Sequence, residues 1–198
     1  MGTRLNIFVS AGPDLEIERE VIGRVVAELP IQRGCEIHRT PRAGEMRQPD
    51  LDAAAECDIF FLLMGADITA PVGVEYDVAR RARRRIVALL RKGQSHTPAG
   101  SIFVRESRLE WDPFEDTDEL EEKVRAALVD VLMEDPHRFG LSPEEWEALE
   151  SLREKEAPAE EGEAIQRPGG AGGGGVILGP EDAARGGVPL PRRGQKGS

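Results

Sequence analysis

Short runs of consecutive apolar residues recur along the first half of the chain, and each has the length of a β-strand. Residues 5–10, 57–65 and 86–90 are nearly continuous in apolar side chains and do not alternate with polar ones. Such continuity is typical of strands covered on both faces, as in a parallel sheet. We predict a weaker strand at 34–38 and a short last one at 102–104.

Segments with helical spacing of apolar residues separate these strands. Apolar residues recur at helical spacing over 21–29, Pro30 ends the helix, and Asp14 is the predicted N-cap. Leu51–Glu56 can form a short helix, and another is predicted to follow Pro71. The predicted buried stripe of this last helix is Val74, Val78 and Ala82.

Alternating strands and helices predict an α/β fold, with a doubly wound, mainly parallel sheet of four to five strands. One connection does not fit this pattern. Residues 91–100, between the last two predicted strands, show no helical periodicity. Either this crossover is a bare loop, or the last strand is an antiparallel edge, and the pattern leaves both open.

The second half of the chain begins with two helix-start signals and ends in a low-complexity segment. Asp116 and Ser142 each open a capping-box pattern, and the helix after Ser142 is short and acidic. Beyond it the chain is rich in Gly and Pro and cannot bury enough apolar surface to fold. We therefore divide the chain into an α/β domain (1–133), an acidic helical appendage (134–156) and a disordered tail (157–198).

The charge and the cysteine and histidine content of the chain argue against several classes of function. The net charge of −11 argues against general nucleic-acid binding, although five arginines lie within residues 80–85, which we expect to form a solvated helix end. Two cysteines cannot form a disulfide scaffold, and three scattered histidines show no metal-ligand spacing. With no apolar run of membrane-spanning length, we expect a cytoplasmic protein with no membrane and no metal site.

Candidate chemistry gathers where the predicted strands end, because ligands of open parallel sheets bind beyond the carboxyl ends of the strands. The polar and glycine residues expected there for substrate binding are Ser10, Gly12, Asp14 and Gly65. Glu75 and Asp67 are the catalytic candidates. We expect Glu75 in the first turn of its helix, where the helix dipole keeps a carboxylate ionised. A first-turn glutamate is also favourable without any catalytic role.

The order of several short motifs resembles an uncharacterised bacterial TIR-like family, a domain of unknown function. These motifs are Ile7-Phe8-Val9-Ser10, Asp58-Ile59-Phe60, Met64-Gly65 and Val74-Glu75-Tyr76-Asp77. The same stretch is similar to nucleoside 2-deoxyribosyltransferases through Ala11-Gly12-Pro13. The resemblance implies a TIR-like or flavodoxin-like sheet. It also implies that Glu75 inherits the position of a glutamate that acts on the ribosyl carbon.

Two functions follow as hypotheses. The first is a TIR-like signalling or interaction module of a bacterial stress or defence system, acting through a protein partner or self-association. The alternative is an effector enzyme that uses Glu75 to cleave the N-glycosidic bond of NAD or a nucleoside. The sequence predicts few polar residues near Glu75, which favours the interaction module. The predicted position of Glu75, where a strand is followed by a helix and ligands bind, favours the enzyme. We expect no cofactor, with NAD or another nucleotide as a candidate ligand.

Overall fold

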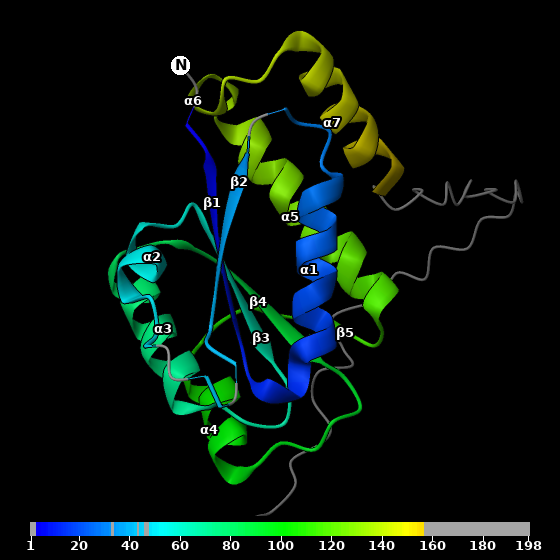
Figure 1. The fold of residues 1–198 in the computed structure, drawn as a ribbon. Coiled ribbons are helices and arrows are strands. Elements are labelled where there is room, and N and C mark those ends of the chain that lie inside the picture. Colours follow the sequence, from blue (N-terminus) through cyan, green and yellow to red (C-terminus); the bar gives the residue numbers. More distant parts are fainter. Residues whose placement is uncertain (1–2, 33, 43, 46–47, 157–198) are drawn as a thin grey trace, which may run out of the picture. The chain divides into compact units, whose positions relative to one another are not determined.

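Five parallel strands form one sheet in the order β2-β1-β3-β4-β5 in a computed structural model of the chain (Figure 1). The structure describes residues 3–32, 34–42, 44–45 and 48–156, so the predicted disordered tail lies outside the described residues. The strands are β1 (Leu5–Ala11), β2 (Cys35–Arg39), β3 (Ile59–Met64), β4 (Arg85–Arg91) and β5 (Trp111–Phe114). The parallel sheet confirms the predicted α/β class.

Helices cover both faces of the sheet (Figure 1). One face carries α1 (Glu16–Glu28), which follows the 3-10 turn η1 (Pro13–Leu15), together with α5 (Thr117–Glu134). The other face carries α2 (Leu51–Glu56), α3 (Ala70–Arg81) and α4 (Pro98–Glu106). The chain continues into α6 (Pro136–Phe139) and α7 (Pro143–Glu156), and α7 packs on α5. None of the helices among the described residues has both the length and the apolar composition to cross a bilayer.

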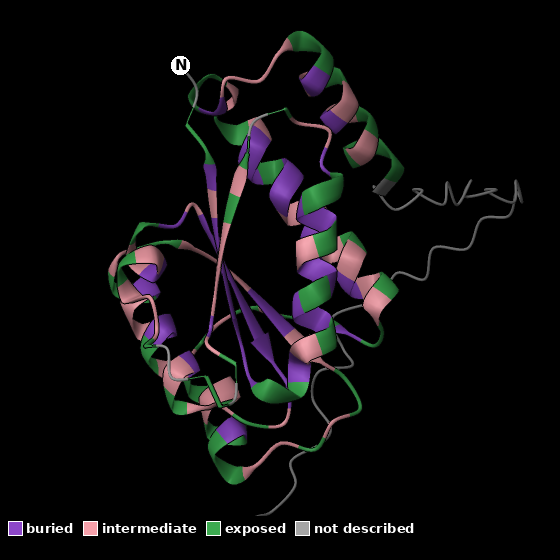
Figure 2. Ribbon diagram, in the orientation of Figure 1, coloured by how far each residue is buried: buried purple, intermediate pink, exposed green. Residues whose placement is uncertain are grey.

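The core consists of two clusters, one on each face of the sheet, because successive side chains of the central strands point to opposite faces. Ile59, Phe61 and Leu63 of β3 join the cluster under α1 and α5. Phe60 and Leu62 point to the opposite cluster, under α2 and α3. All six residues of β3 are buried, and the central strands β1 and β3 are the most buried part of the sheet (Figure 2). The prediction that the continuous apolar run at 57–65 forms a strand covered on both faces is therefore confirmed.

The last strand predicted from the sequence is wrong. Residues 102–104 lie inside α4, and the final strand is β5, which pairs with β4 in parallel. The physical reason is the start of α4: Thr97 caps it by accepting from the Gly100 N–H at 3.1 Å, and Pro98 occupies the first helical position. A helix thus supplies the crossover that the pattern lacked, and neither a bare loop nor an antiparallel edge is needed.

The buried stripe predicted for α3 is wrong at Val74, whereas Val78 is partly buried and packs against the core. The helix buries Val72, Glu75, Tyr76 and Ala79, whereas Val74 is 48% exposed. Because the helix begins at Ala70, Glu75 lies beyond its first turn, and the dipole argument for an ionised carboxylate does not apply to it. This correction places a carboxyl group on the face of α3 that packs against the sheet.

Capping signals in the second half were predicted correctly. Asp116 caps α5 by accepting from the N–H groups of Asp118 and Glu119. At the start of α7, the Ser142 N–H donates to the Glu145 carboxylate at 2.7 Å, and the Glu145 N–H donates to the Ser142 hydroxyl at 3.2 Å. The bonds between Ser142 and Glu145 are reciprocal, whereas Glu119 accepts from the Glu115 N–H, one residue before the N-cap, at 2.7 Å. Both caps could be predicted because their partners are close neighbours in the chain.

Candidate active site

Glu75 is a fully buried carboxyl group at the carboxyl edge of the sheet, with an exposed fraction of 0%. Ser10, near the end of β1, donates a hydrogen bond to Glu75 Oε2 at 2.6 Å. Thr40, immediately after β2, donates to the same oxygen at 2.6 Å. Side chains that follow β1, β2 and β3 therefore meet at one atom. In the strand order β2-β1-β3 this is the topological switch point, where open parallel sheets bind ligands.

Thr40 is itself held in place by two further contacts. The Ala11 N–H donates to the Thr40 hydroxyl oxygen at 3.3 Å, which leaves the hydroxyl proton for Glu75. The Arg19 guanidinium donates to the Thr40 carbonyl oxygen. Arg19 is only 2% exposed and forms an ion pair with Glu16 at 3.4 Å. The loop after β2 is thus tied to α1 and β1 at the point where it contacts Glu75.

Burial governs the protonation of Glu75. Loss of solvation raises its pKa above the usual value, although the hydrogen bonds from Ser10 and Thr40 and the charge of Arg19 act in the opposite direction. Its second oxygen, Oε1, is buried and has no hydrogen-bond partner among the described residues. The carboxyl group therefore keeps its proton to a higher pH than an exposed glutamate does, whereas the helix dipole expected from the sequence would have lowered its pKa.

The raised pKa predicts a pH-dependent stability difference between the wild type and Glu75→Gln. Because the folded state binds this proton more tightly than the unfolded chain, the wild type loses stability as pH rises from about the usual value of 4.5 through the raised pKa. Gln has no proton to lose, so the variant should gain on the wild type by about 1.4 kcal/mol for each unit by which folding raises the pKa. Thermal melts of both proteins between acid and mildly alkaline pH measure this. A gain of the wild type on the variant as pH rises would contradict it.

Asp14 and Asp67, both candidates from the sequence, make a separate set of contacts. Asp14 Oδ2 accepts from the Ala66 N–H at 2.8 Å, and Asp14 caps neither η1 nor α1, whose N-caps are Gly12 and Leu15. The N-cap prediction for Asp14 is therefore wrong. Asp67 accepts from the Thr97 hydroxyl and from the Ile68 N–H. Among the described contacts neither aspartate is bonded to Glu75, and both instead join the loops that follow β1, β3 and β4.

Gly12 and Gly65 lie where the Asp14 carboxylate passes close to the backbone. A Cβ atom at Gly12 would lie 2.6 Å from Asp14 Oδ1. A Cβ atom at Gly65 would collide with Asp14 Oδ2 and lie 3.1 Å from Leu15 Cγ. Both glycines therefore allow the Asp14 contact, and their predicted role in substrate binding stays a prediction.

Two cavities adjoin Thr40. The first, of about 280 Å³, we call the proline cavity. Its lining is Ala11, Pro13, Thr40, Pro41, Arg42, Glu45, Pro49, Thr69 and Pro71. The second, of about 320 Å³, we call the arginine cavity. Its lining is Arg19, Ile37, His38, Arg39, Thr40, Arg42 and Glu45. Glu75 lines neither, so the Thr40 side chain stands between the buried carboxyl group and both cavities.

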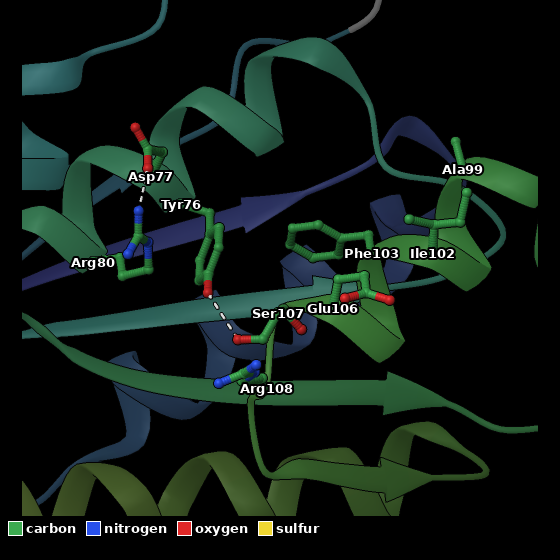
Figure 3. Close-up of a pocket in the computed structure, with 9 residues that line it drawn as sticks. All are labelled: Tyr76, Asp77, Arg80, Ala99, Ile102, Phe103, Glu106, Ser107 and Arg108. Carbon is green, nitrogen blue, oxygen red and sulfur yellow. Dashed lines mark hydrogen bonds and ion pairs between the residues drawn. The ribbon is translucent and has the colours of Figure 1, made fainter.

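A larger cavity, of about 650 Å³, is a groove between α3 and α4 (Figure 3). Its lining includes Tyr76 and Phe103, whose rings meet edge to face at 5.3 Å. None of the residues predicted for catalysis or substrate binding lines it. Size alone therefore does not identify the candidate active site, because the buried polar side chains converge at Glu75 and not in this groove.

Thr40 and Arg19 were missed as site residues by the sequence interpretation. Arg19 does carry a signal, because it falls at helical spacing between Leu15 and Ile22, on the buried face of its helix. Glu75 carries the same signal between Val72 and Ala79. A charged residue at an apolar-stripe position marks a buried polar site. Thr40 lies in an irregular segment and gives no comparable signal.

Comparisons with known proteins show a similarity of fold to a solved structure. No protein-family model matches the chain, and no curated protein matches it. The fold is similar to that of the Clostridium botulinum CMP N-glycosidase BcmB, with 17% sequence identity and a TM-score of 0.41. The alignment covers 60% of this chain and 97% of the other. Membership of the TIR-like family stays a prediction.

Proposed function

We propose that the chain is an enzyme that cleaves the N-glycosidic bond of a nucleotide or nucleoside, with Glu75 as the reacting carboxyl group. The observation that supports this is the convergence of the Ser10 and Thr40 hydroxyls on one oxygen of a fully buried glutamate. Burying a carboxyl group is costly, and a purely structural site would be served better by an apolar residue. Perturbed, positioned carboxyl groups at a ligand edge are typical of catalytic sites.

The chemistry follows from what a positioned carboxyl group can do at a ribosyl carbon. The bond from C1′ to the base nitrogen breaks, and its electron pair leaves with the base. The positive charge that develops at C1′ is stabilised by the Glu75 carboxylate, or captured by it as a covalent intermediate. Water supplies the hydroxyl group to C1′ and a proton to the base. Two donors on Oε2 fix the orientation of the carboxylate and leave Oε1 for the substrate.

Access requires a local movement. Thr40 separates Glu75 from the proline and arginine cavities, so a bound substrate must displace the Thr40 side chain to reach Oε1. Displacement would break one hydrogen bond to the carboxylate and expose it to the ribosyl carbon. Asp67 has no part in this proposal, because its carboxylate is occupied by Thr97 and the Ile68 N–H.

The direct test is to incubate the purified full chain with NAD, nucleosides and nucleoside monophosphates, and to measure free base by chromatography. We expect base release from at least one of these classes. A folded protein that releases no base from any of them would contradict the proposal.

A second candidate function is self-association of an interaction module, and the α3–α4 groove favours it. Ile102, which lines the groove, is 53% exposed, and with the rings of Tyr76 and Phe103 it adds an accessible apolar side chain to the groove. The rim holds two acids, Asp77 and Glu106, and two bases, Arg80 and Arg108. Equal numbers of both signs suit a two-fold interface, in which the same surface of a second copy is its partner.

Replacing Ile102 with Asp should weaken this self-association at least about tenfold, because a charge would enter the apolar centre of the interface. Light scattering during gel filtration over a range of concentrations measures the effect. Ile17→Asp is the matched control, since Ile17 is 69% exposed on α1, away from the groove. A wild type that stays monomeric at all concentrations would exclude this second candidate.

A further inference from the structure

The arginine cavity gathers three guanidinium groups next to the candidate active site. They come from three segments: Arg19 from α1, Arg39 from the end of β2, and Arg42 from the loop that follows. Their side chains are 3%, 29% and 54% exposed, so Arg19 is buried, Arg39 is partly buried and Arg42 is exposed. A concave site lined by arginines is suited to a planar or tetrahedral anion, which arginine binds with paired hydrogen bonds.

Arg19 has an unused donor. Its terminal nitrogens bond to Thr40 and Glu16, but its Nε is buried and has no partner among the described residues. A buried donor without a partner is costly to the folded state, and more so when it belongs to a charged group. Because Arg19 lines the cavity, a ligand oxygen there can reach this donor once the guanidinium rotates toward it. This orphaned donor is the observation that separates the arginine cavity from an ordinary solvated cluster.

Arg39 is packed closely against α1. Its guanidinium lies over Gly23, where an added Cβ atom would collide with Nη2 and lie 3.6 Å from Cζ. The absence of a side chain at Gly23 therefore lets Arg39 rest against the helix beside Arg19. Two of the three arginines are thus held by packing before any ligand arrives.

Acidic neighbours contact all three arginines, since Glu16 pairs with Arg19 as well as with Arg42. Arg39 and Arg42 share Glu20 Oε1 at 3.2 and 2.7 Å, and Arg42 also contacts Glu16 at 3.0 Å. Glu45 lines the cavity as well. Glu20 is 58% exposed, and exposed ion pairs contribute little because water screens them. A dianion that takes paired hydrogen bonds from two arginines can therefore replace these contacts.

We propose that the arginine cavity is the subsite for a phosphate group, so that the substrate is a nucleoside monophosphate and not a free nucleoside. This rests on the proposed function. The proline cavity, which shares Thr40, Arg42 and Glu45 with the arginine cavity, offers apolar walls to the base. The phosphate and the base then lie on either side of Thr40, and the ribose between them lies over the side chain that covers Glu75.

The first experiment measures anion binding without catalysis. The full chain is titrated with inorganic phosphate at constant ionic strength, by calorimetry, as the wild type and as an Arg39→Gln/Arg42→Gln double variant. We expect the wild type to bind phosphate and the double variant to bind at least about tenfold more weakly. Arg24→Gln is the matched control, because Arg24 is a 55% exposed arginine on α1 that pairs with Glu121. Equal binding by the wild type and the double variant would overturn the proposal.

The second experiment separates this subsite from the proposed function. Base release is compared for a nucleoside and its 5′-monophosphate, with the wild type and the double variant. We expect the wild type to prefer the monophosphate and the double variant to lose that preference. Faster release from the free nucleoside would overturn the subsite while the N-glycosidase proposal stands. Phosphate binding that depends on the arginines, with no base release from any substrate, would support the anion subsite and contradict the N-glycosidase.

Discussion

Glu75→Gln should lower the rate of base release by roughly a hundred- to ten-thousand-fold, while the fold and substrate binding persist. Gln keeps the size of the side chain and an oxygen that can accept from Ser10 and Thr40. It removes the charge that stabilises the cation at C1′, which matters only in the transition state. The effect should therefore fall on kcat and leave KM nearly unchanged.

The measurement compares base release with substrate binding for the wild type and the variant, beside a thermal melt. Glu56→Gln is the matched control, since it removes an exposed carboxylate on α2 and should leave the rate unchanged. Base release that continues at the wild-type rate in Glu75→Gln would remove Glu75 from the mechanism. It would also reduce the buried cluster to a structural feature.

Leu62→Asp should prevent folding. Leu62 is fully buried in β3, between β1 and β4, and its side chain packs under α2 and α3. An unpaired carboxylate there costs several kcal/mol beyond the lost apolar contacts, which is comparable with the whole stability of a domain. The same argument applies to Phe60→Asp, on the same face of the strand.

Circular dichroism and solubility of the expressed protein measure this effect. Leu62→Met is the matched control, because a swap that conserves volume should cost less than about 1.5 kcal/mol and leave a cooperative melt. A soluble Leu62→Asp protein with a normal melt would mean that β3 is not the centre of the core.

The sheet was predictable because its central strands are continuous apolar runs of strand length, which are typical of strands covered on both faces. The two failures have different causes, and the first is the position of a helix start. Residues 102–104 have the composition of a strand, yet the cap at Thr97 and the proline after it begin a helix that includes them. In α3, the face that packs on the sheet is the one with Val72, Tyr76 and Ala79, and it carries Glu75 into the core although a charged residue is unexpected there.

The site was less predictable than the fold because its contacts are long-range. Ser10 and Glu75 are 65 positions apart, and Thr40 and Glu75 are 35 apart. Strand order brings them together, and a single sequence does not contain that order. Glu75 and Ser10 were found through the general rule that parallel sheets bind ligands beyond their strand ends. That rule does not identify Thr40, which lies in an irregular segment, or Arg19, which is a buried charge on a helix.

The position of β1 in the sheet has a consequence for how the chain is made on the ribosome. β1 is the first strand to be synthesised, but it pairs with β3, whose register begins at Ile7 opposite Ile59. At about 5–20 residues per second, this strand waits for seconds before its inner partner exists. Throughout that interval its apolar side chains and its unpaired backbone groups are available to chaperones and to neighbouring nascent chains. We therefore expect protection of β1 during synthesis to raise the yield of folded protein.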